Sequence, residues 1–580
     1  MKKTILSLMA GAALFAACSQ DRLEIPQKGT VTIETFYQND ADAEAALVAA
    51  YQGFLWNICT KEGGNIYAPF HACLNLCGDD MYAAGEFFGD NDFMGAMNEF
   101  RYDNGSEVVR NAYCNIFYAM YYSNLVIENF KDAQTPIQKR AVAEARVLRA
   151  YMQMILTIGW NCPPLVDHVL GATDLPTNYG NNDAASHKEL LMWCAKECEE
   201  AEANLDERAS TSDKDGAVKV TKGFANAVAG KAYLFAGEYD KCKTALKKVI
   251  DSGKYALVPG ERYWENFHIE GDGNEEKIFE ANLELNSNVP VWWDIVNRST
   301  WMEANIWNWR SDHFVANPST TYSSIDGWGG CGVPESFANE MVNNDGEDSY
   351  RLKATIIPIT DVVYNTVYNI EDIDNMTLEQ KKTSDKVGIG LKGLYGQSFY
   401  LPLKPVCRIN DLAGPGQNIR VNNFVIMRYA EVLLMYAEAC LQTGDAASAK
   451  TYINQIQQRA GSKTISETVD MNVLKREKKL ELWLEGCRWF DMVRWGDTDG
   501  AKNAGQNVTV LYDKLSRPAA SSDENVKYNP KDDRFYLVTT HAAKDRGDKI
   551  GFVAGKHEYF PFPNTVTSKN PNLIQNPGWE

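Results

Sequence analysis

Two helical hairpins that share one spacing of small and aromatic residues constrain the fold of this chain most strongly. The first hairpin carries, in order, Gly230, Tyr233, Gly237, Tyr239, Cys242 and Leu246. The second carries, at the same offsets, Ala437, Cys440, Gly444, Ala446, Ala449 and Ile453. In each hairpin the central glycine would make the turn, the small residues would let two helices approach, and the larger residues would fill the seam.

This spacing is typical of tetratricopeptide repeats, although Cys242 replaces the usual alanine. The alternative is an unrelated helical hairpin with a glycine turn. Apolar periodicity predicts further helices at 41–56, 107–130, 136–158, 186–205, 219–236 and 239–252. Short turns join them, so neighbouring helices should be antiparallel. The sequence therefore predicts a mostly α fold, with a tetratricopeptide-like hairpin scaffold over about 38–255 and 425–500.

A long loop-rich insertion separates the two hairpins. Residues 255–425 contain much less helical periodicity and are rich in glycine, asparagine, proline and tryptophan. Irregular segments of this length in a compact protein are usually functional or disordered, and this one is too aromatic to be disordered. Residues 500–580 are again mixed and turn-rich. We expect residues 38–580 to form one body in which 255–425 binds the ligand.

The N-terminus has the pattern of an exported lipoprotein. Lys2 and Lys3 precede an apolar run from Ile5 to Phe15, and Ala16-Ala17-Cys18 closes it. The run is too short to cross a bilayer, and small residues lie where a signal peptidase would cut. We therefore predict a signal peptide over 1–17, acyl chains on Cys18, and a lipid-anchored tether over 18–37. The alternative is an ordinary secretory signal followed by a chance cysteine, and Phe15 stands where leucine is usual.

Composition argues against several classes of partner and cofactor. The formal net charge is −19 and no basic block offsets it, which disfavours nucleic acid. The sequence has neither a G-x-x-x-x-G-K-[ST] nor an H-E-x-x-H motif. His71, Cys73 and Cys77 could begin a zinc site but lack a fourth ligand, and calcium near Asp90, Asn91 and Asp92 lacks the required ligand pattern. We expect no cofactor, and the remaining cysteines do not suggest a disulfide framework.

Several ordered segments carry a resemblance to a known family. They include Leu23-Glu24-Ile25-Pro26, Ala145-Arg146-Val147-Leu148-Arg149-Ala150-Tyr151, Met427-Arg428-Tyr429-Ala430-Glu431, Arg476-Glu477-Lys478-Lys479-Leu480-Glu481 and the terminal Asn570-Pro571-Asn572-Leu573-Ile574-Gln575-Asn576-Pro577-Gly578-Trp579. Together with Cys18, this order resembles the SusD/RagB group of surface glycan-binding lipoproteins of Bacteroidetes. Where that family often has Asp-Pro-Arg, this chain has Asp348-Ser349-Tyr350-Arg351, which we expect in a turn.

The resemblance implies a non-catalytic protein that captures glycans at the cell surface. It also implies an outer-membrane location through the N-terminal acyl chains and delivery of the glycan to a SusC-like TonB-dependent barrel transporter. Two alternatives remain open. A surface glycoside hydrolase would need two carboxylates flanking the scissile bond, and no such pair stands out. A relative that serves peptide uptake would use the helical-repeat surface to bind peptides.

The charged segment around residue 480 could be mistaken for a catalytic site. Glu477, Glu481, Glu485 and Arg488 follow one another at helical spacings of four and three. They can pair with one another, or with Arg428 and Glu431 on a facing helix. We therefore interpret them as scaffold salt bridges.

Two patches are candidates for the glycan platform. Six of the 14 tryptophans cluster between 292 and 328, interleaved with polar residues: Trp292, Trp293, Trp301, Asn305, Trp307, Trp309, Arg310, Asp312 and Trp328. Aromatic faces can cover the C–H face of a sugar ring, while amides and charged groups bond its hydroxyl rim. The second patch is Asp79, Asp80 and Tyr82, followed by further aromatics. The alternative is that these aromatics pack loops onto helices and that the aspartates cap or stabilise turns.

Overall fold

The computed structural model covers the helical scaffold and most of the insertion. It describes residues 35–59, 69–85, 90, 92–283, 294–318, 322–323, 325–414, 417–499, 508–516, 526–529, 531–540 and 551–580. The predicted signal peptide, Cys18, Trp292 and Trp293 lie outside the described residues, as does most of the predicted tether. Those predictions therefore stay predictions.

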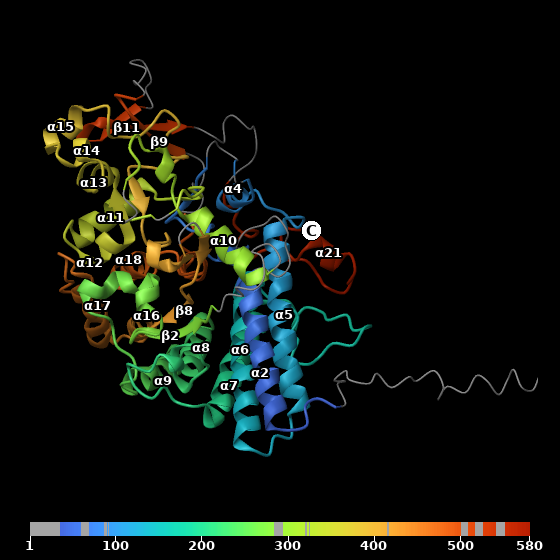
Figure 1. Ribbon diagram of the computed structural model, residues 1–580. Helices are drawn as coiled ribbons and strands as arrows, with labels where there is room; N and C mark the ends of the chain where they lie inside the picture. The colour runs from blue at the N-terminus through green and yellow to red at the C-terminus, as the bar shows by residue number, and fades with distance from the viewer. Residues whose placement is uncertain are drawn as a thin grey trace, which may run out of the picture.

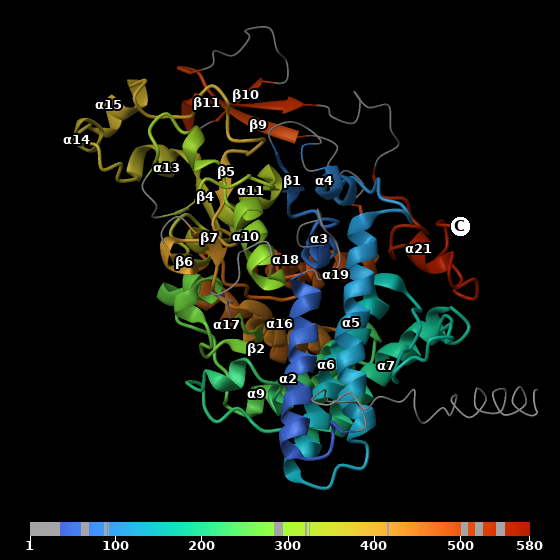
Figure 2. The ribbon, with the colours of Figure 1, turned by 45° about the vertical axis from the view of Figure 1, so that its right-hand side comes forward.

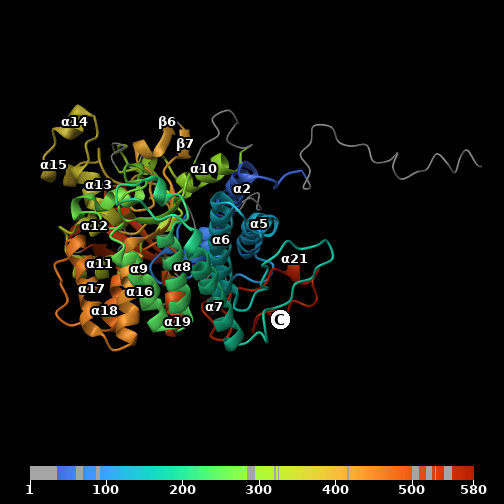
Figure 3. The same cartoon turned by 90° about the horizontal axis from the view of Figure 1, so that it is seen from below.

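A bundle of long helices forms the N-terminal part of the scaffold (Figure 1). Its helices are α2 (Asp40–Ile58), α5 (Glu107–Asn129), α6 (Pro136–Trp160) and α7 (Ala184–Ala201). Helix α6 begins with a favourable cap, because Thr135 accepts the Gln138 amide and Pro136 occupies the first turn. Seen from below, α6 lies between α8 (Lys222–Phe235) on one side and α2 and α5 on the other, and it contacts all of these helices and α7 (Figure 3). This central position explains why nearly every residue of its second half is buried.

Both predicted hairpins are confirmed. The first is α8 (Lys222–Phe235) with α9 (Tyr239–Asp251), and the second is α16 (Tyr429–Gln442) with α17 (Ala446–Ala460). The turn glycines Gly237 and Gly444 have φ of 72° and 82°, a conformation that L side chains rarely adopt. A Cβ on Gly230 would overlap the Leu246 side chain, so this position needs a small residue where α8 meets α9. Helix α9 packs on α16, which brings the two hairpins together although the insertion separates them in sequence.

A short antiparallel pair of strands closes the insertion at its base. Strand β2 (Lys277–Ala281) follows the first hairpin, and β8 (Phe424–Arg428) runs directly into α16. Their register pairs Ala281 with Phe424 and Lys277 with Arg428. The chain therefore leaves the scaffold and returns to it at one place, which lets a long insertion grow without breaking the helical stack.

The insertion contains more helix than its sequence predicts. Its helices are α10 (Ile295–Trp307), α11 (Glu335–Asp345), α12 (Tyr350–Thr355), α13 (Ile359–Asn365), α14 (Glu371–Asp374) and α15 (Leu378–Thr383). Its strands are β3 (Cys331–Gly332), β4 (Ile356–Pro358), β5 (Tyr400–Pro402), β6 (Leu412–Gly414) and β7 (Gln417–Arg420). Strands β4 and β5 pair with each other, as do β6 and β7. Most of these helices are shorter than the window in which helical periodicity can be recognised.

The remaining elements lie above and beside the bundle (Figure 2). Near the N-terminus are α3 (Pro69–Asn75), β1 (Tyr82–Ala83) and α4 (Asp92–Asn98). After the second hairpin come α18 (Met471–Glu481), α19 (Arg488–Trp495), an antiparallel sheet of β9 (Val508–Asp513), β10 (Val526–Asn529) and β11 (Asp532–Thr540), and finally α21 (Asn564–Thr567). The C-terminal segment returns to the bundle, where Trp160 Nε1 donates to Pro561 O at 3.0 Å. Within the described residues, no helix combines the length and apolarity that a membrane crossing requires.

Candidate functional site

Two tryptophans of the insertion form a half-buried pair. Trp301 lies on α10 and Trp328 on the loop that precedes β3, and their rings meet edge to face with centroids 5.6 Å apart. The loop is fixed to the end of the helix, because the amide of Trp328 donates to Asn305 O at 2.5 Å and that of Gly330 donates to Ile306 O at 2.7 Å. These bonds satisfy carbonyls that a helix C-terminus leaves without intrahelical partners. The pair is therefore held by backbone as well as by ring contact.

Charged side chains lie beside this pair. Arg310 Nε donates to Asp312 Oδ1 at 2.8 Å, and the guanidinium lies over the Tyr395 ring at 5.0 Å from the centroid. Asp312 is exposed, and Arg310 and Tyr395 are half-buried. Partial burial and the charge of Asp312 raise the pKa of nearby Asp326. We call Trp301, Arg310, Asp312, Trp328 and Tyr395 the outer face.

Tyr395 occupies a strained backbone position. Its φ is +52°, which is uncommon for a residue with a side chain. Its ring also meets the His313 ring edge to face at 4.8 Å. A Cβ placed on Gly329 would lie 3.6 Å from the Tyr395 Cβ, so Tyr395 adjoins the loop that carries Trp328. Sequence reasoning missed Tyr395, although its setting between Gly393 and Gly396 was a turn signal close to an aromatic residue.

The structure brings the two candidate patches together. Strand β1 pairs with β3, so that Tyr82 lies opposite Gly332, and the Gly85 amide donates to Tyr395 O at 3.0 Å. The Tyr82 hydroxyl donates to Gly396 O at 2.8 Å and the side chain is buried. Tyr82 thus supports the loop that carries Tyr395 from beneath.

Asp79 binds side chains of α18 and α19, and the backbone carbonyl of Asp80 accepts a hydrogen bond from Trp483 Nε1 at 2.7 Å. Asp79 accepts two hydrogen bonds from Arg488, at 2.6 and 2.9 Å, and lies 3.3 Å from Lys479 Nζ. Burial alone would raise the pKa of Asp79, but Arg488 and Lys479 lower it to about 2. Burial and the charge of Asp79 raise the pKa of Asp80 to about 7. Both aspartates have structural partners, and a glycan contact for either stays a prediction.

Three other predicted site residues face the protein interior. Trp309 is 1% exposed and meets Phe314 edge to face, with ring centroids 6.0 Å apart. Asn305 is buried and donates to Trp301 O at 2.7 Å. Trp307 is also buried and lines a cavity on the other side of α10 from Trp301.

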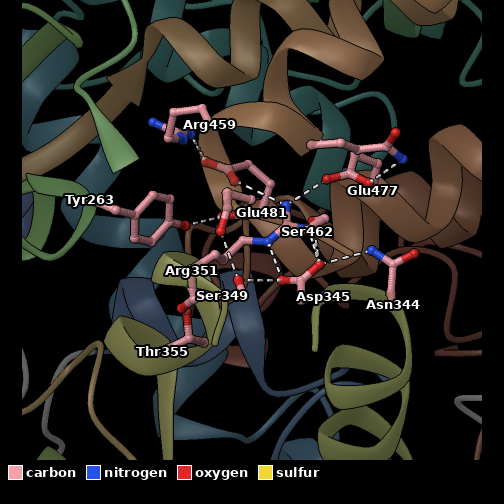
Figure 4. Close-up of polar contacts among 12 residues, drawn as sticks. Tyr263, Asn344, Asp345, Ser349, Arg351, Thr355, Arg459, Ser462, Glu477 and Glu481 are labelled. Atoms are coloured by element: carbon pink, nitrogen blue, oxygen red, sulfur yellow. Dashed lines mark hydrogen bonds and ion pairs between the residues drawn. The ribbon is translucent and has the colours of Figure 1, made fainter. Parts of the chain in front are cut away.

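The carboxylates around residue 480 belong to a buried ion network (Figure 4). Arg351 lies at its centre and bonds Asp345 twice at 2.8 Å, Glu477 at 2.6 Å and Glu481 at 3.1 Å. The Ser462 hydroxyl donates to Asp345 at 2.7 Å. Because these groups are fully buried and hydrogen-bonded, they meet the conditions under which charges persist in a protein interior.

A second arginine extends the network. Arg428 bonds Glu485 through two nitrogens at 2.6 and 2.8 Å and also bonds Glu481, which confirms the pairing predicted for that arginine. Other pairings differ from the prediction, because Arg488 binds Asp79 and Glu431 binds Lys231 at 2.8 Å.

The segment that departs from the family pattern, residues 348–351, is more than a turn. Ser349 accepts the Leu352 amide and thereby caps α12. Arg351 lies within that helix, which carries its guanidinium into the buried network.

The described residues contain no group of three or more histidine, cysteine or acidic side chains placed to hold a metal ion. Cys73 and Cys77 are buried, and the thiol of Cys77 lies 3.6 Å from Met97 O. Asp92 pairs with Arg101 at 2.8 Å, while Asn91 lies outside the described residues. That the protein needs no cofactor stays a prediction.

The outer face has a clear chemical capability. Half-buried indole and phenol rings can cover an apolar ligand surface, and the adjacent guanidinium and carboxylate can bond polar groups at its edge. The carboxylate of Asp312 is held by Arg310, which favours a fixed hydrogen-bonding role.

Comparison with known proteins gives SusD-like relatives by sequence and similar glycan-binding proteins by structure. Residues 304–579 match the model of the SusD family. The chain is 23% identical over 508 residues to a SusD-like protein of Bacteroides ovatus, covering 85% of this chain and 83% of the relative. It is 22% identical over 505 residues to SusD-like protein P38 of Formosa agariphila, covering 81% and 87%.

Solved structures show the same fold over nearly the whole chain. A laminarin-binding SusD-like protein aligns with a TM-score of 0.68 at 20% identity, covering 93% of this chain and 100% of that one. Surface glycan-binding protein A from Bacteroides thetaiotaomicron, in complex with laminarihexaose, gives the same values. The family match includes most of the outer face and the ion network, and the two relatives extend it across both halves of the chain. The predicted resemblance to the SusD family is confirmed over residues 304–579, and SusD-like relatives cover 85% and 81% of the chain.

Proposed function

We propose that this protein is a non-catalytic, lipid-anchored glycan-binding protein that uses the outer face as its platform. The observation that carries the proposal is the proximity of two half-buried aromatic groups: the loop that bears Trp328, paired with Trp301, adjoins Tyr395, which lies under the Arg310–Asp312 pair. Sugar rings offer an apolar C–H face and a rim of hydroxyls, and this surface has a partner for each. The laminarin and laminarihexaose named for two similar structures support a glycan as the ligand class.

The arrangement of carboxylates favours binding over hydrolysis. A glycosidase places an acid and a nucleophile or base on either side of the scissile bond. On the outer face Asp312 is paired with Arg310, and the acidic residues of α18 are buried in the ion network. A hydrolase would release reducing ends from a polysaccharide, whereas we expect retention on immobilised glycan without product.

The anchor and the partner complete the proposal. Acyl chains on Cys18 would hold the protein at the outer membrane, facing the cell surface, where it would pass glycans to a SusC-like TonB-dependent barrel. A stable complex with the barrel should bury more than about 1,000 Å². Gentle detergent extraction and pull-down should recover a large barrel protein. Recovery of this protein alone in every detergent would contradict the partnership.

The platform is tested by removing one ring at a time. Trp301→Ala and Trp328→Ala should each weaken binding to the glycan retained by the parent about tenfold, since a stacking ring contributes about 1–2 kcal/mol. Affinity electrophoresis over a polysaccharide panel would identify that glycan first, and isothermal titration would measure the change. Affinities should lie in the micromolar to millimolar range, roughly −4 to −8 kcal/mol.

Trp193→Ala provides the matched control. Trp193 is half-buried on α7 and has Arg149 over its ring, so it is a tryptophan of similar exposure on another part of the scaffold. Its loss should leave glycan binding unchanged. Unchanged binding by both outer-face variants would place the platform elsewhere. Binding of oligopeptides but of no glycan would favour the peptide-uptake alternative.

A further inference from the structure

A small cavity is lined by Glu303 and Trp307 of α10 and by none of the residues of the outer face. It encloses about 120 Å³ between α3, α10, strands β7 and β8, and the segment that joins α18 to α19. Its walls include the aromatic side chains of Phe70, Trp307 and Phe424. Half-exposed residues such as Arg420 and Ile426 also line it, so the cavity communicates with solvent.

Two polar groups in this cavity have unused hydrogen-bonding capacity. Glu303 has a side chain that is 3% exposed and makes no hydrogen bond to any described residue. His71 Nε2 lies 3.5 Å from Glu303 Oε1, and that nitrogen is buried without a hydrogen-bond partner. Buried polar groups are normally satisfied by protein, water or a ligand, because an unmet one costs free energy. The cavity is thus built for an occupant with hydrogen-bonding groups.

The charges around the cavity nearly balance. Lys404 bonds Glu485 at 2.5 Å and donates to Glu481 O, so its charge is matched. Arg420 donates to Asn422 at 2.7 Å and has no acidic partner among the described residues, and Glu303 provides the opposite charge. Burial lowers the pKa of His71 to about 4 and raises that of Glu303 to about 7. The imidazole stays neutral, and the cavity otherwise offers one carboxyl group and one guanidinium of opposite charge. This combination favours a neutral ligand over an ion.

We infer that this cavity binds one neutral sugar ring, with Glu303, His71 and Arg420 bonding its hydroxyl groups and Trp307 covering its apolar face. A closed cavity of about 150 Å³ holds one benzene ring, so this one of about 120 Å³ takes at most one ring, whose hydroxyl groups would extend toward the half-exposed Arg420 and Ile426. Carboxylate and guanidinium groups make stronger hydrogen bonds to hydroxyls than neutral groups do. This inference extends the proposed glycan binding to a second, separate site, and it does not need the outer face to bind a polymer.

The test measures free monosaccharides against the mature full-length protein. Saturation-transfer NMR and titration with D-glucose, D-galactose and D-mannose should show one site for at least one hexose, with a dissociation constant on the order of millimolar. D-glucuronate should bind more weakly than the corresponding neutral sugar. Glu303→Gln preserves side-chain shape and should weaken the hexose about tenfold, as should Arg420→Met. Thermal melting would confirm that each variant folds. If Glu303→Gln does not fold, Arg420→Met still tests the inference.

Trp328→Ala separates the cavity from the outer face. It should leave hexose binding unchanged while it weakens polysaccharide binding. Suppose that Trp328→Ala loses hexose binding while Glu303→Gln and Arg420→Met retain it. The sugar would then bind at the outer face, and the inference would be overturned. Absence of hexose binding to the parent at several hundred millimolar would mean that water alone fills the cavity. Preference for glucuronate would overturn the neutral-ligand assignment.

Discussion

Replacing Arg351 with methionine should strongly destabilise the fold without acting on the ligand directly. Methionine keeps much of the arginine stem but removes a guanidinium that bonds Asp345, Glu477 and Glu481. Breaking a buried ion pair by removing one partner costs about 3–5 kcal/mol. The remaining partners limit the loss, because Ser462 still bonds Asp345 and Gln457 still bonds Glu477 at 3.0 Å. We therefore expect the free energy of unfolding to fall by about 4 kcal/mol at pH 7.

The loss should depend on pH in a defined direction. Burial alone would raise the pKa of Asp345, but Arg351 lowers it below its ordinary value. A carboxyl group with a depressed folded-state pKa contributes stability above its unfolded-state pKa, and this stability is lost as the pH falls through the folded value. In Arg351→Met the carboxyl groups can take up protons instead of remaining as unpaired charges. The difference between parent and variant should therefore be largest at neutral pH and shrink below about pH 5.

Urea unfolding followed by circular dichroism measures both effects. Lys353→Met is the control, since Lys353 and its partner Asp348 are exposed and such pairs contribute about 0–1 kcal/mol. A loss below about 1 kcal/mol in Arg351→Met, or one that grows on acidification, would refute the assignment of this cluster to the scaffold. Glycan binding per folded molecule should be unchanged, and its loss in well-folded protein would give the cluster a role in recognition.

Three further predictions address the cavity, the loop and the anchor. Because burial raises the folded-state pKa of Glu303 to about 7, parent stability should decrease between about pH 4.5 and 7 by up to roughly 3 kcal/mol. In Glu303→Gln the free energy of unfolding should not show this decrease. If parent and variant had the same urea-unfolding profiles at pH 5 and at pH 8, the prediction would be contradicted. In Gly327→Ala the new Cβ would overlap Asn308 O, so the loop bearing Trp328 should shift, at a cost of about 1–3 kcal/mol and with weaker glycan binding. Gly414→Ala meets no atom within 4 Å and should have little effect, so equal melting temperatures for these two variants would count against the reasoning. Cys18→Ser should move the protein from the membrane fraction to the soluble fraction, and firm membrane retention would exclude acylation of that thiol as the anchor.

The scaffold could be predicted from sequence because its signals are local. The offsets from Gly230 to Leu246 and from Ala437 to Ile453 specify two hairpins, and both formed as α8–α9 and α16–α17. Glycine at each turn and small residues at each crossing are properties of short windows. The packing of α9 on α16 across the insertion needed the structure, since it depends on the β2–β8 pair that closes the insertion.

The candidate site was predicted only in outline. The density of tryptophan indicated residues 292–328 as a candidate region, but composition does not state which ring faces solvent. Trp301 and Trp307 lie on one helix six residues apart, yet Trp301 pairs with Trp328 while Trp307 faces the cavity. Tyr395 reaches the outer face because its backbone adopts a rare conformation and bonds Gly85, a contact between residues that are distant in sequence. Similarly, the pairing of Arg351 with Glu477 spans 126 positions.

The contrast between the two groups of buried carboxylates separates scaffold from candidate site. Glu481 and Glu485 stand in a dense run of charges that resembles an active site in sequence, but their oxygens are bonded by Arg351, Arg428 or Lys404. Glu303 stands among tryptophans and asparagines with no charged neighbour in sequence, and it is the carboxyl group left without a hydrogen bond beside a cavity. A network that satisfies its own members has little capacity to bind a ligand, whereas a buried group without a partner retains that capacity. Whether a buried carboxyl group has hydrogen-bond partners cannot be read from the sequence. This property distinguishes the scaffold carboxylates of α18 from Glu303 on α10.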